Sequence, residues 1–369
     1  MTVKRDLKKT VLDSRHRNLG ARMAPFGGYW MPIQYKSILA EHAATRNKAS
    51  VFDTCHMGEF KISGASALES LEQILSCDLS TMSIGQCRYG LLCNPQGGVL
   101  DDLVVYRLAE DDFMLVVNAG TQDEDYEWIS MHVLKNTVMR NESEAVAKMD
   151  LQGPHSPRIL QALVDESIED LKYYTFRENS YMGRRVLISR TGYTGEVGFE
   201  VYSDPDSIGM FWDRCIEMGA VASGLGARNT LRLEMGLPLY GHEWSRQRNA
   251  ADAGLERFIS KTKRFIGCDP IRSDEVRKER LVGIAFESKQ AAREENPILF
   301  EDGKQIGIVT SGSFAPSLGY AIALGYIDFN YALPETKIAV NGRHRLVGKV
   351  VSLPFYTNGT ARKNLSDFL

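Results

Sequence analysis

Two acidic residues stand side by side in an apolar segment of this chain, directly after a pair of glycines. Asp101 and Asp102 follow Gly97-Gly98 in a strand-like run, residues 99–106. Successive side chains of a strand point to opposite faces, so one of the two carboxylates must face a covered surface. A buried carboxylate costs free energy unless it is paired or used in chemistry. A hairpin turn explains the glycines but leaves the adjacent acids unexplained.

The alternation of side chains along a strand gives the two acids different surroundings, but it does not show which of them is chemically active. Asp102 is expected to share its face with Leu100, Val104 and Tyr106, and Asp101 to share its face with Val99, Leu103 and Val105. Both faces are largely apolar, so the choice of the chemically active residue stays open at this point.

A glycine-rich segment precedes a second candidate carboxylate. Residues 192–198 contain three glycines, which permit a tight loop and a close approach of the backbone to a ligand. In the strand that follows, Glu200 and Tyr202 lie on one face, opposite Phe199 and Val201. A carboxylate such as Glu200 can accept two hydrogen bonds from a planar pair of N–H donors. The structural alternative is a hairpin with a solvated face.

Two arginines lie in a third segment, residues 223–241, which contains several glycines. This segment is not a Gly-x-Gly-x-x-Gly fingerprint, and the chain has no Walker pattern, so we expect no cradle for nucleotide phosphates. On residue type alone, Arg228 and Arg232 could equally belong to an ordinary helix with surface ion pairs.

The histidines and cysteines do not form a metal-binding pattern. They are scattered, without His-x-x-x-His or Cys-x-x-Cys spacing, so we predict no metal site. Cys55 and His56 are adjacent, but neighbours in a strand face apart, which favours a structural role for both over a catalytic pair.

The elements around these candidates read as short strands and amphipathic helices. Residues 51–108 contain strands joined by glycine turns, with a helix predicted at 65–76, and a similar alternation returns at 145–219. Without strict βαβ alternation, this pattern predicts an α+β fold with antiparallel sheets. The charged stretch 273–280 is predicted to be a linker, and residues 281–353 to form the strands of a β-barrel or sandwich.

Composition excludes several classes of protein. A chain of 369 residues, 43% hydrophobic, is expected to form two or three globular domains. A net charge of −3 argues against nucleic-acid or membrane-surface binding, and no apolar run approaches the ~20 residues that span a bilayer. The N-terminus lacks the apolar core of a secretory signal, and six cysteines are too few for a disulfide scaffold. We expect a cytoplasmic protein, or a mitochondrial-matrix protein in a eukaryote.

Taken together, nine segments resemble one family, in order, from about residue 15 to residue 356. The chain is identified from them as a member of the family of the glycine-cleavage-system T protein, a tetrahydrofolate-dependent aminomethyltransferase. The segments are His42-Ala-Ala-Thr-Arg46, Phe52-Asp-Thr-Cys-His-Met-Gly58, Gly97-Gly-Val-Leu-Asp-Asp102, Leu151-Gln-Gly-Pro154, Arg190-Thr-Gly-Tyr-Thr-Gly-Glu196, Gly224-Leu-Gly-Ala-Arg228, Leu231-Arg-Leu-Glu234, Leu237-Pro-Leu-Tyr-Gly-His242 and Thr310-Ser-Gly312.

The resemblance implies a three-domain cloverleaf with folate in a central opening. We expect a first α+β region at 1–145, a second at 146–272, the two interleaved in part, and a barrel-like or jelly-roll-like domain at 273–369. The implied reaction moves an aminomethyl group from the lipoyl arm of the H protein to tetrahydrofolate, releasing ammonia. The implied partner is the acidic, lipoylated H protein, and its candidate contacts are Arg246, Arg248 and Arg264. The implied oligomeric state is a monomer.

The resemblance also carries residue roles. Asp102 matches the essential aspartate of the family, Glu200 its pterin-binding glutamate and Arg228 a folate-contacting arginine. Further positions that match the family's folate site, or are expected to face it, are Tyr89, Tyr193, Met57, Asn118 and Tyr106.

Departures from the family pattern leave the one-carbon donor open. They lie at Thr54-Cys55, Val197, Asn229 and residues 249–252. A sibling enzyme that takes one carbon from a methylated amine or sulfonium compound is therefore the alternative. A non-catalytic folate-binding module is disfavoured, because the Lys-Gly-Cys-Tyr-x-Gly-Gln signature of that branch is absent.

Overall fold

A five-stranded antiparallel sheet carries the two neighbouring acids. The computed structural model describes residues 7–254, 256–273 and 277–369. In spatial order this sheet contains β5 (Cys87–Cys93), β6 (Val99–Ala109), β7 (Asp112–Val117), β4 (Gly58–Ser63) and β8 (Val138–Asn141). Helices α3 (Ala67–Ile74) and α4 (Gln122–His132) follow the helical spacing of their apolar residues and pack on one face, where Leu71 and Ile129 are fully buried.

A six-stranded sheet lies beside it and carries Glu200. Its order is β10 (Phe176–Tyr181), β11 (Arg184–Ser189), β12 (Gly198–Ser203), β9 (Ala147–Gln152), β3 (Ser50–Asp53) and β13 (Val221–Ala222). Helices α5 (Ser156–Leu163) and α6 (Pro205–Glu217) cover one face, and Phe199 and Val201 are buried there. Glu200 and Tyr202 consequently face the other side, as alternation predicts.

The opposite, polar face of this sheet meets α7 and the five-stranded sheet. Helix α7 (Leu225–Glu234) packs against it through Leu231, which contacts Phe52 of β3. The Tyr106 hydroxyl of β6 lies 2.9 Å from the Tyr202 hydroxyl of β12. The interior between the two sheets is therefore polar, in contrast to their outer, helix-covered faces.

The N-terminal segment adds a hairpin and two helices to this arrangement. They are α1 (Asp13–Asn18), β1 (Arg22–Phe26), β2 (Tyr29–Gln34) and α2 (Ile38–Asn47). The two sheets interleave in sequence, because β3 belongs to the six-stranded sheet and β4, the next strand, to the five-stranded sheet. The domain boundaries 1–145, 146–272 and 273–369 stay a prediction.

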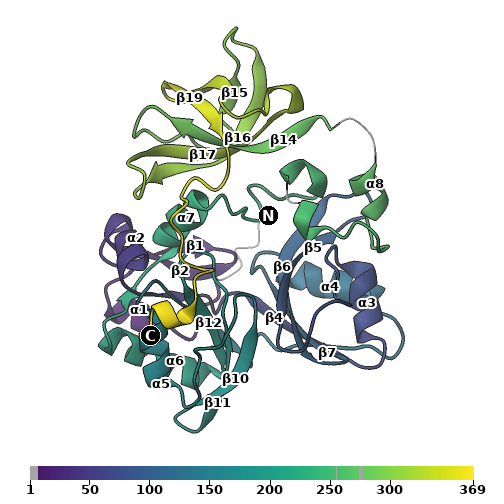
Figure 1. Cartoon of the computed structure of the whole chain (residues 1–369), viewed down its shortest axis with the longest axis vertical. Coiled ribbons are helices and arrows are strands. Elements are labelled where there is room, and N and C mark those ends of the chain that lie inside the picture. Colours follow the sequence, from purple (N-terminus) through teal and green to yellow (C-terminus); the bar gives the residue numbers. More distant parts are fainter. Residues whose placement is uncertain (1–6, 255, 274–276) are drawn as a thin grey trace.

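The C-terminal region forms a closed six-stranded barrel, at the top of Figure 1. Going round the barrel, the strands are β14 (Glu279–Phe286), β17 (Tyr320–Asp328), β16 (Gln305–Ala315), β15 (Pro297–Leu299), β18 (Lys337–Asn341) and β19 (Arg345–Val351). This confirms the α+β class with a C-terminal β-barrel. Residues 274–276 of the predicted linker lie outside the described residues, as do residues 1–6.

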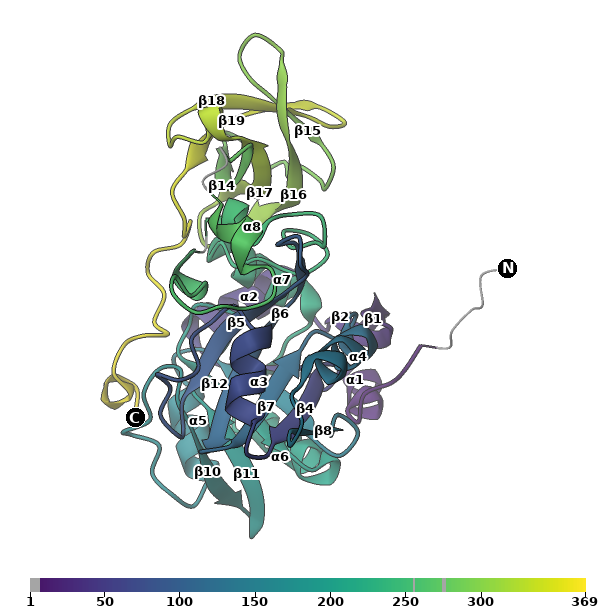
Figure 2. The ribbon, with the colours of Figure 1, turned by 90° about the vertical axis from the view of Figure 1, so that its right-hand side faces the viewer.

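Short helices and a C-terminal strap connect the barrel to the sheets. The connecting helices are η1 (Ala250–Ala253), η2 (Glu256–Phe258) and α8 (Cys268–Arg272), while η3 (Phe329–Tyr331) lies between β17 and β18 of the barrel and η4 (Leu365–Asp367) lies in the strap. The strap, residues 352–369, leaves the barrel and returns along the molecule to the six-stranded sheet (Figures 1 and 2), where Leu365 is buried with α5 and α6. Within the described residues, no helix is long and apolar enough to cross a membrane.

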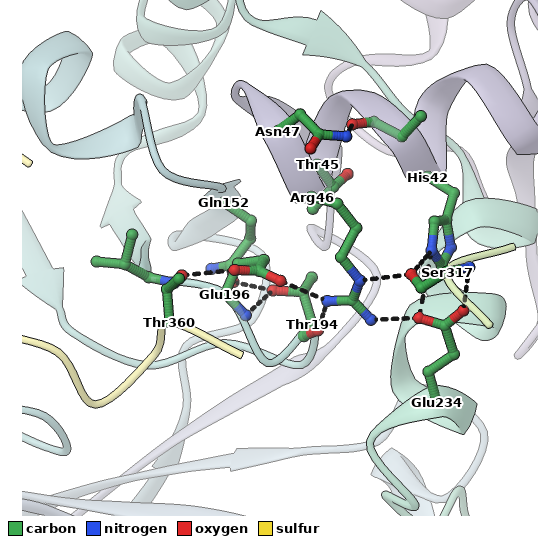
Figure 3. Close-up of polar contacts among 12 residues, drawn as sticks. His42, Thr45, Arg46, Asn47, Gln152, Thr194, Glu196, Glu234, Ser317 and Thr360 are labelled. Atoms are coloured by element: carbon green, nitrogen blue, oxygen red, sulfur yellow. Dashed lines mark hydrogen bonds and ion pairs between the residues drawn. The ribbon is translucent and has the colours of Figure 1, made fainter. Parts of the chain in front are cut away.

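A buried arginine of α2 joins these parts (Figure 3). The Arg46 guanidinium lies 2.8 Å from Glu196 in the loop before β12 and 2.8 Å from Glu234 at the end of α7. Ser317, in the loop between β16 and β17, accepts a hydrogen bond from Arg46 and donates its backbone N–H to Glu234. Tyr356 of the strap stacks on the guanidinium at 4.2 Å. One cation thus contacts the loop before Glu200, α7, the barrel and the strap.

We predict that Arg46→Met lowers the free energy of unfolding by ~3–5 kcal/mol, because two buried carboxylates lose their cation. Urea unfolding at pH 7.5 measures the change. The control is Arg214→Met, which removes an exposed pair with Glu217 and should change stability by less than ~0.5 kcal/mol. Equal midpoints for Arg46→Met and the control would contradict the central role of Arg46.

Candidate active site

Strand β6 separates the two neighbouring acids. Asp102 faces the six-stranded sheet, where its Oδ2 accepts a hydrogen bond from the Tyr89 hydroxyl at 2.9 Å and its Oδ1 accepts one from the Asn118 amide at 3.0 Å. Trp244 donates to the same Tyr89 hydroxyl at 3.2 Å and fixes its position. Asp101 is fully buried on the other face and accepts hydrogen bonds from the backbone and side-chain N–H groups of Asn118.

The expectation that Leu100 shares the face of Asp102 is wrong. The register of β5 and β6 shifts between Leu92 and Cys93, and this irregularity breaks the alternation at the start of β6. Leu100 therefore packs in the core beneath α3, while Val99 packs in a separate core with Leu91.

Asp101 does not hold the glycine turn that precedes it. The Gly97-Gly98 turn is held by Asn94, whose side-chain oxygen accepts hydrogen bonds from the backbone N–H groups of Gln96 and Gly98. Asp101 instead fixes Asn118, the residue that follows β7. Asp101 is thus a support for a residue that contacts Asp102.

Burial raises the pKa of Asp102 to about 7, and the negative charge of Asp101 adds to the rise, while the hydrogen bonds from Tyr89 and Asn118 oppose it. Burial likewise raises the pKa of Asp101. Behind it, burial and the charge of Asp101 raise the pKa of Asp125 to about 10, so Asp125 keeps its proton at neutral pH. Asp102 is therefore a carboxyl group that can exchange a proton near physiological pH.

Glu200 lies in a cradle of two tyrosines and a lysine. Its Oε2 accepts hydrogen bonds from Tyr202 at 2.7 Å and Tyr106 at 3.1 Å and lies 3.4 Å from the Lys148 ammonium. Among the described residues, no hydrogen bond to its Oε1 is formed, although Glu200 is only 7% exposed. The second oxygen of this largely buried carboxylate thus stays available for a ligand's N–H groups, which is what a pterin edge would need.

A chain of alternating charges runs from Glu200 to Arg228 along the polar face. Lys148 lies 3.3 Å from Asp150, whose other oxygen lies 2.6 Å from the Arg228 guanidinium. Although burial opposes it, the negative charges of Asp150 and Glu200 raise the pKa of Lys148. Arg228 stacks on the Tyr193 ring at 5.0 Å. The buried charges are therefore compensated in pairs.

Lys148 and Asp150 are site residues that the sequence analysis missed. Both are buried, and they occupy alternate positions in an otherwise apolar predicted strand. That spacing was a usable signal, because it places a lysine and an aspartate on the same face as the facing residue Glu200.

Met57, Cys55 and His56 lie at the edge of this cluster. Met57 contacts the Lys148 ammonium through its sulfur at 3.5 Å. The Cys55 thiol donates to the Lys148 carbonyl, and burial raises its pKa. Burial lowers the pKa of His56 to about 4, so it stays neutral. These surroundings are those of structural groups, in keeping with the role expected for Cys55 and His56.

The glycines of residues 192–198 admit a neighbouring side chain. A Cβ atom at Gly192 or Gly198 would collide with the amide of Gln152, which donates to the Thr191 and Phe199 carbonyls. The close approach inferred from these glycines is therefore made by Gln152, beneath the strand that carries Glu200.

A cavity of about 410 Å³ extends from Tyr193 and Arg228 to the barrel. Its wall is apolar at the β1–β2 hairpin and at the start of α7, carries polar side chains further along α7, and is polar where the barrel contributes Thr310, Ser311 and Arg293. The remaining lining residues are Phe26, Ile33, Leu225, Gly226, Asn229, Arg232, Leu239, His242, Glu294 and Gly312. A chain-like, mostly apolar group fits such a passage better than a compact charged one.

Known proteins resemble this chain over nearly its whole length. The model of the GCVT N-terminal domain matches residues 12–263, and that of the glycine cleavage T-protein C-terminal barrel domain matches residues 279–357. The aminomethyltransferase of Moorella thermoacetica is 42% identical over 362 residues, 95% of this chain and 98% of that protein. The aminomethyltransferase of Halothermothrix orenii is 40% identical over 357 residues, 95% and 100% of the two chains.

A solved structure agrees with these matches. The glycine cleavage system aminomethyltransferase T from Bartonella henselae superimposes with a TM-score of 0.91 at 30% identity, covering 97% of this chain and 100% of that one. The chain belongs to the glycine cleavage T-protein family. The aminomethyltransferases of this family are one-carbon transferases, and this chain is an enzyme of that kind.

The departures from the family pattern have structural roles in this chain. Thr54 donates to Asp150 at 2.9 Å. The Val197 backbone N–H donates to Thr360 of the strap, and Asn229 accepts from Arg232 on α7. Asn249 caps η1. The hydrogen bonds and ion pairs of Asp102 and Glu200 described above are made by other residues.

We predict that Asp102→Asn raises the melting temperature at pH 8 and that the gain is clearly smaller at pH 5. The folded-state pKa of Asp102, about 7, lies above the ordinary value of 3.8, so the folded state loses stability as the pH rises from about 4 to about 7, and the full loss is present at pH 8. A neutral amide avoids that loss, which we expect to be worth ~2–4 °C. Thermal unfolding at both pH values measures it. Asp165→Asn, an exposed control, should show no such pH-dependent gain; a similar gain there would contradict the prediction.

Proposed function

We propose that this chain transfers the aminomethyl group of a lipoylated H protein to tetrahydrofolate, and that Asp102, Glu200 and Arg228 are its principal site residues. The observation that supports this most is the common face of Asp102 and Tyr106 on β6. Tyr106 binds Glu200, and four strand residues span about 13 Å. A recognition group and a reactive carboxyl group are thus aligned along one wall, as an elongated substrate requires.

Glu200 recognises the pterin in this proposal. The 2-amino group and N3–H of a pterin form a planar pair of donors, which one carboxylate accepts together. Tyr106, Tyr202 and Lys148 contact Oε2 and hold the carboxylate in place, with Oε1 free to accept from the pterin. Tyr89 and Tyr193 offer aromatic faces for the flat pterin and benzoyl groups.

Asp102 stabilises the positive charge that develops during the transfer and exchanges protons with the reacting groups. The aminomethyl carbon leaves sulfur and nitrogen and becomes bonded to N5 and N10 of tetrahydrofolate. The two N–H protons lost from those nitrogens equal the two gained by the lipoyl thiol and by ammonia. A carboxylate beside the carbon stabilises the positive charge that develops there. A pKa near 7 lets the same group accept a proton and return it.

The lipoyl arm enters through the cavity between α7 and the barrel. The apolar lining, including Ile33, Leu225 and Leu239, suits the hydrocarbon of the arm, and the passage leads to Tyr193. Arg246 and Arg264 are engaged with Glu124 and Asp269, and Arg248 packs on Tyr326. Arg293, exposed on the barrel and lining the cavity, therefore becomes the preferred contact for the acidic H protein.

The experiment that tests the proposal combines the purified protein with tetrahydrofolate and aminomethylated H protein and measures ammonia release. Ammonia and 5,10-methylenetetrahydrofolate in equal amounts are expected. Formation of methylenetetrahydrofolate from a methylated amine or sulfonium compound, with no release from H protein, would overturn the proposal in favour of a sibling enzyme.

We predict that Glu200→Ala weakens tetrahydrofolate binding by ~1–3 kcal/mol, the cost of leaving charged hydrogen bonds unmade. Isothermal titration calorimetry measures the dissociation constant. Glu178→Ala, which removes an exposed glutamate from β10 of the same sheet, is the matched control and should bind like the wild type. Unchanged affinity in Glu200→Ala would remove Glu200 from the binding site.

We predict that Asp102→Asn lowers turnover by at least ~100-fold while folate affinity stays within ~3-fold, since shape and Tyr89 contact are largely kept. Asp101→Asn should retain turnover within ~10-fold and lower the melting temperature, because Asp101 supports Asn118 from the buried side. Initial rates and thermal unfolding of both variants decide between them. Loss of turnover in Asp101→Asn with near-normal rates in Asp102→Asn would reverse the assignment.

A further inference from the structure

A buried indole lies behind the tyrosine that binds Asp102. Trp244 is fully buried, and its Nε1–H donates to the Tyr89 hydroxyl at 3.2 Å. That hydroxyl in turn donates to the Asp102 Oδ2 at 2.9 Å. Trp244 itself belongs to an apolar core that it shares with η1 and β17. A chain of two hydrogen bonds therefore leads from this core to the reactive carboxyl group.

The chemistry of the indole fixes the direction of this chain. An indole nitrogen can only donate, whereas a phenol oxygen can both donate and accept. The Tyr89 oxygen must therefore accept from Trp244. Burial and the charge of Asp102 raise the pKa of Tyr89, so the hydroxyl keeps its hydrogen at neutral pH. Because the Trp244 N–H points at the oxygen, the Tyr89 hydrogen is directed to its other partner, Asp102.

The backbone on both sides of Trp244 is fixed. The Glu243 carbonyl accepts a hydrogen bond from the Tyr326 hydroxyl of β17 at 3.0 Å. The Ser245 carbonyl accepts one from the Val99 N–H of β6, also at 3.0 Å. Strand β6 carries the reactive carboxyl group as well. The indole and the carboxyl group are thus held on one framework, which preserves the orientation of the hydroxyl between them.

This arrangement favours the ionised form of Asp102. Its Oδ2 faces the Tyr89 hydrogen, and its Oδ1 faces the Asn118 amide at 3.0 Å. A carboxylate accepts both bonds, whereas a proton added to either oxygen must displace a donor. The Tyr89 hydrogen could turn away to make room, but the Trp244 N–H opposes that rotation. The indole therefore disfavours protonation of a group that it does not contact.

Other charged and titratable groups surround Asp102. They are Asp101 on β6, Asp125 on α4, Tyr89 on β5, Tyr193 in the loop before β12, Tyr240 with Arg246, and the ion pairs Arg228–Asp150 and Arg232–Glu243. Replacing Trp244 by phenylalanine leaves each of these groups in place. A change in the titration of Asp102 in that variant would therefore report the orientation of the hydroxyl.

We propose that Trp244 is a positioning residue, which directs the Tyr89 hydroxyl hydrogen to Asp102 and thereby keeps that carboxyl group ionised near neutral pH. This rests on the proposed function, in which the carboxylate stabilises the positive charge that develops on the transferred carbon. Trp244 acts on the reaction through Tyr89. It sets the lower end of the pH range in which the enzyme works.

The test follows the Asp102 carboxyl carbon by NMR titration of the full-length protein, with aspartate labelled with 13C at that carbon. Asp102→Asn identifies the signal. Trp244→Phe and Tyr89→Phe should each raise the titration midpoint by ~0.5–1 pH unit, because each removes the oriented donor. The double variant should shift no further than Tyr89→Phe alone, since both residues act through one hydroxyl.

The matched control is Trp212→Phe, which should leave the midpoint unchanged. Trp212 is also fully buried, but its indole nitrogen has no hydrogen-bond partner among the described residues. The pH profile of ammonia release gives a second readout. In Trp244→Phe its acidic limb should move to higher pH, while turnover at pH 9 stays within ~3-fold of the wild type. A merely structural defect would instead lower turnover equally at every pH.

Two results would overturn the inference. One is a wild-type midpoint in Trp244→Phe together with a raised midpoint in Tyr89→Phe. The other is a double variant whose shift equals the sum of the single shifts, because Trp244 would then act independently of Tyr89. If the midpoints move as expected but no ammonia is released from H protein, the proposed function fails and the orientation of Tyr89 by Trp244 stands. The two failures are thereby distinguished.

Discussion

The buried Arg46 guanidinium is the interaction on which the relative positions of the site residues depend. Its carboxylate partners are Glu196, four residues before Glu200, and Glu234, in the same helix as Arg228. Although burial opposes it, the hydrogen bonds and charges of His42 and Arg46 lower the pKa of Glu234 to about 2. Charges that have been removed from water tolerate little displacement, because each lost contact leaves an uncompensated charge. The cradle of Glu200 and the helix of Arg228 are therefore fixed to one common point.

Two aspartates of the same interior illustrate how local charge sets their chemistry. Although burial opposes it, the charges of Lys148 and Arg228 keep the pKa of Asp150 below its ordinary value. Burial and the neighbouring anion Asp101 raise the pKa of Asp102 to about 7, against the hydrogen bonds from the neutral donors Tyr89 and Asn118. The first is a permanent anion that orders two cations, and the second is ready to exchange a proton. The difference arises from position on two strands rather than from residue type.

Sequence reasoning succeeded where the residue pattern within one strand determines which way a side chain faces. It failed where a neighbouring strand, helix or sheet determines it. Period-two alternation correctly placed Glu200 with Tyr202, and Asp101 opposite Asp102. It misplaced Leu100, because the shift at the start of β6 depends on the register with β5. Lys148 and Asp150 were missed because α7 and the other sheet bury them. Arg46 lies in one of the nine family-like segments, but its role could not be predicted, since its side-chain partners lie 150, 188 and 271 positions away.

Helix α7 links the barrel to the site because buried ion pairs hold it along its whole length. Arg228 binds Asp150 below it. Arg232, one turn later, binds Glu243 at 2.9 Å and donates to Ser311 of the barrel at 2.8 Å. Glu234 at its end binds Arg46. A helix of ten residues restrained at three positions cannot move at one end without breaking a buried pair at the other. The cavity beside it is consequently lined by a rigid wall, so a ligand that enters from the barrel side reaches a site whose geometry is already set.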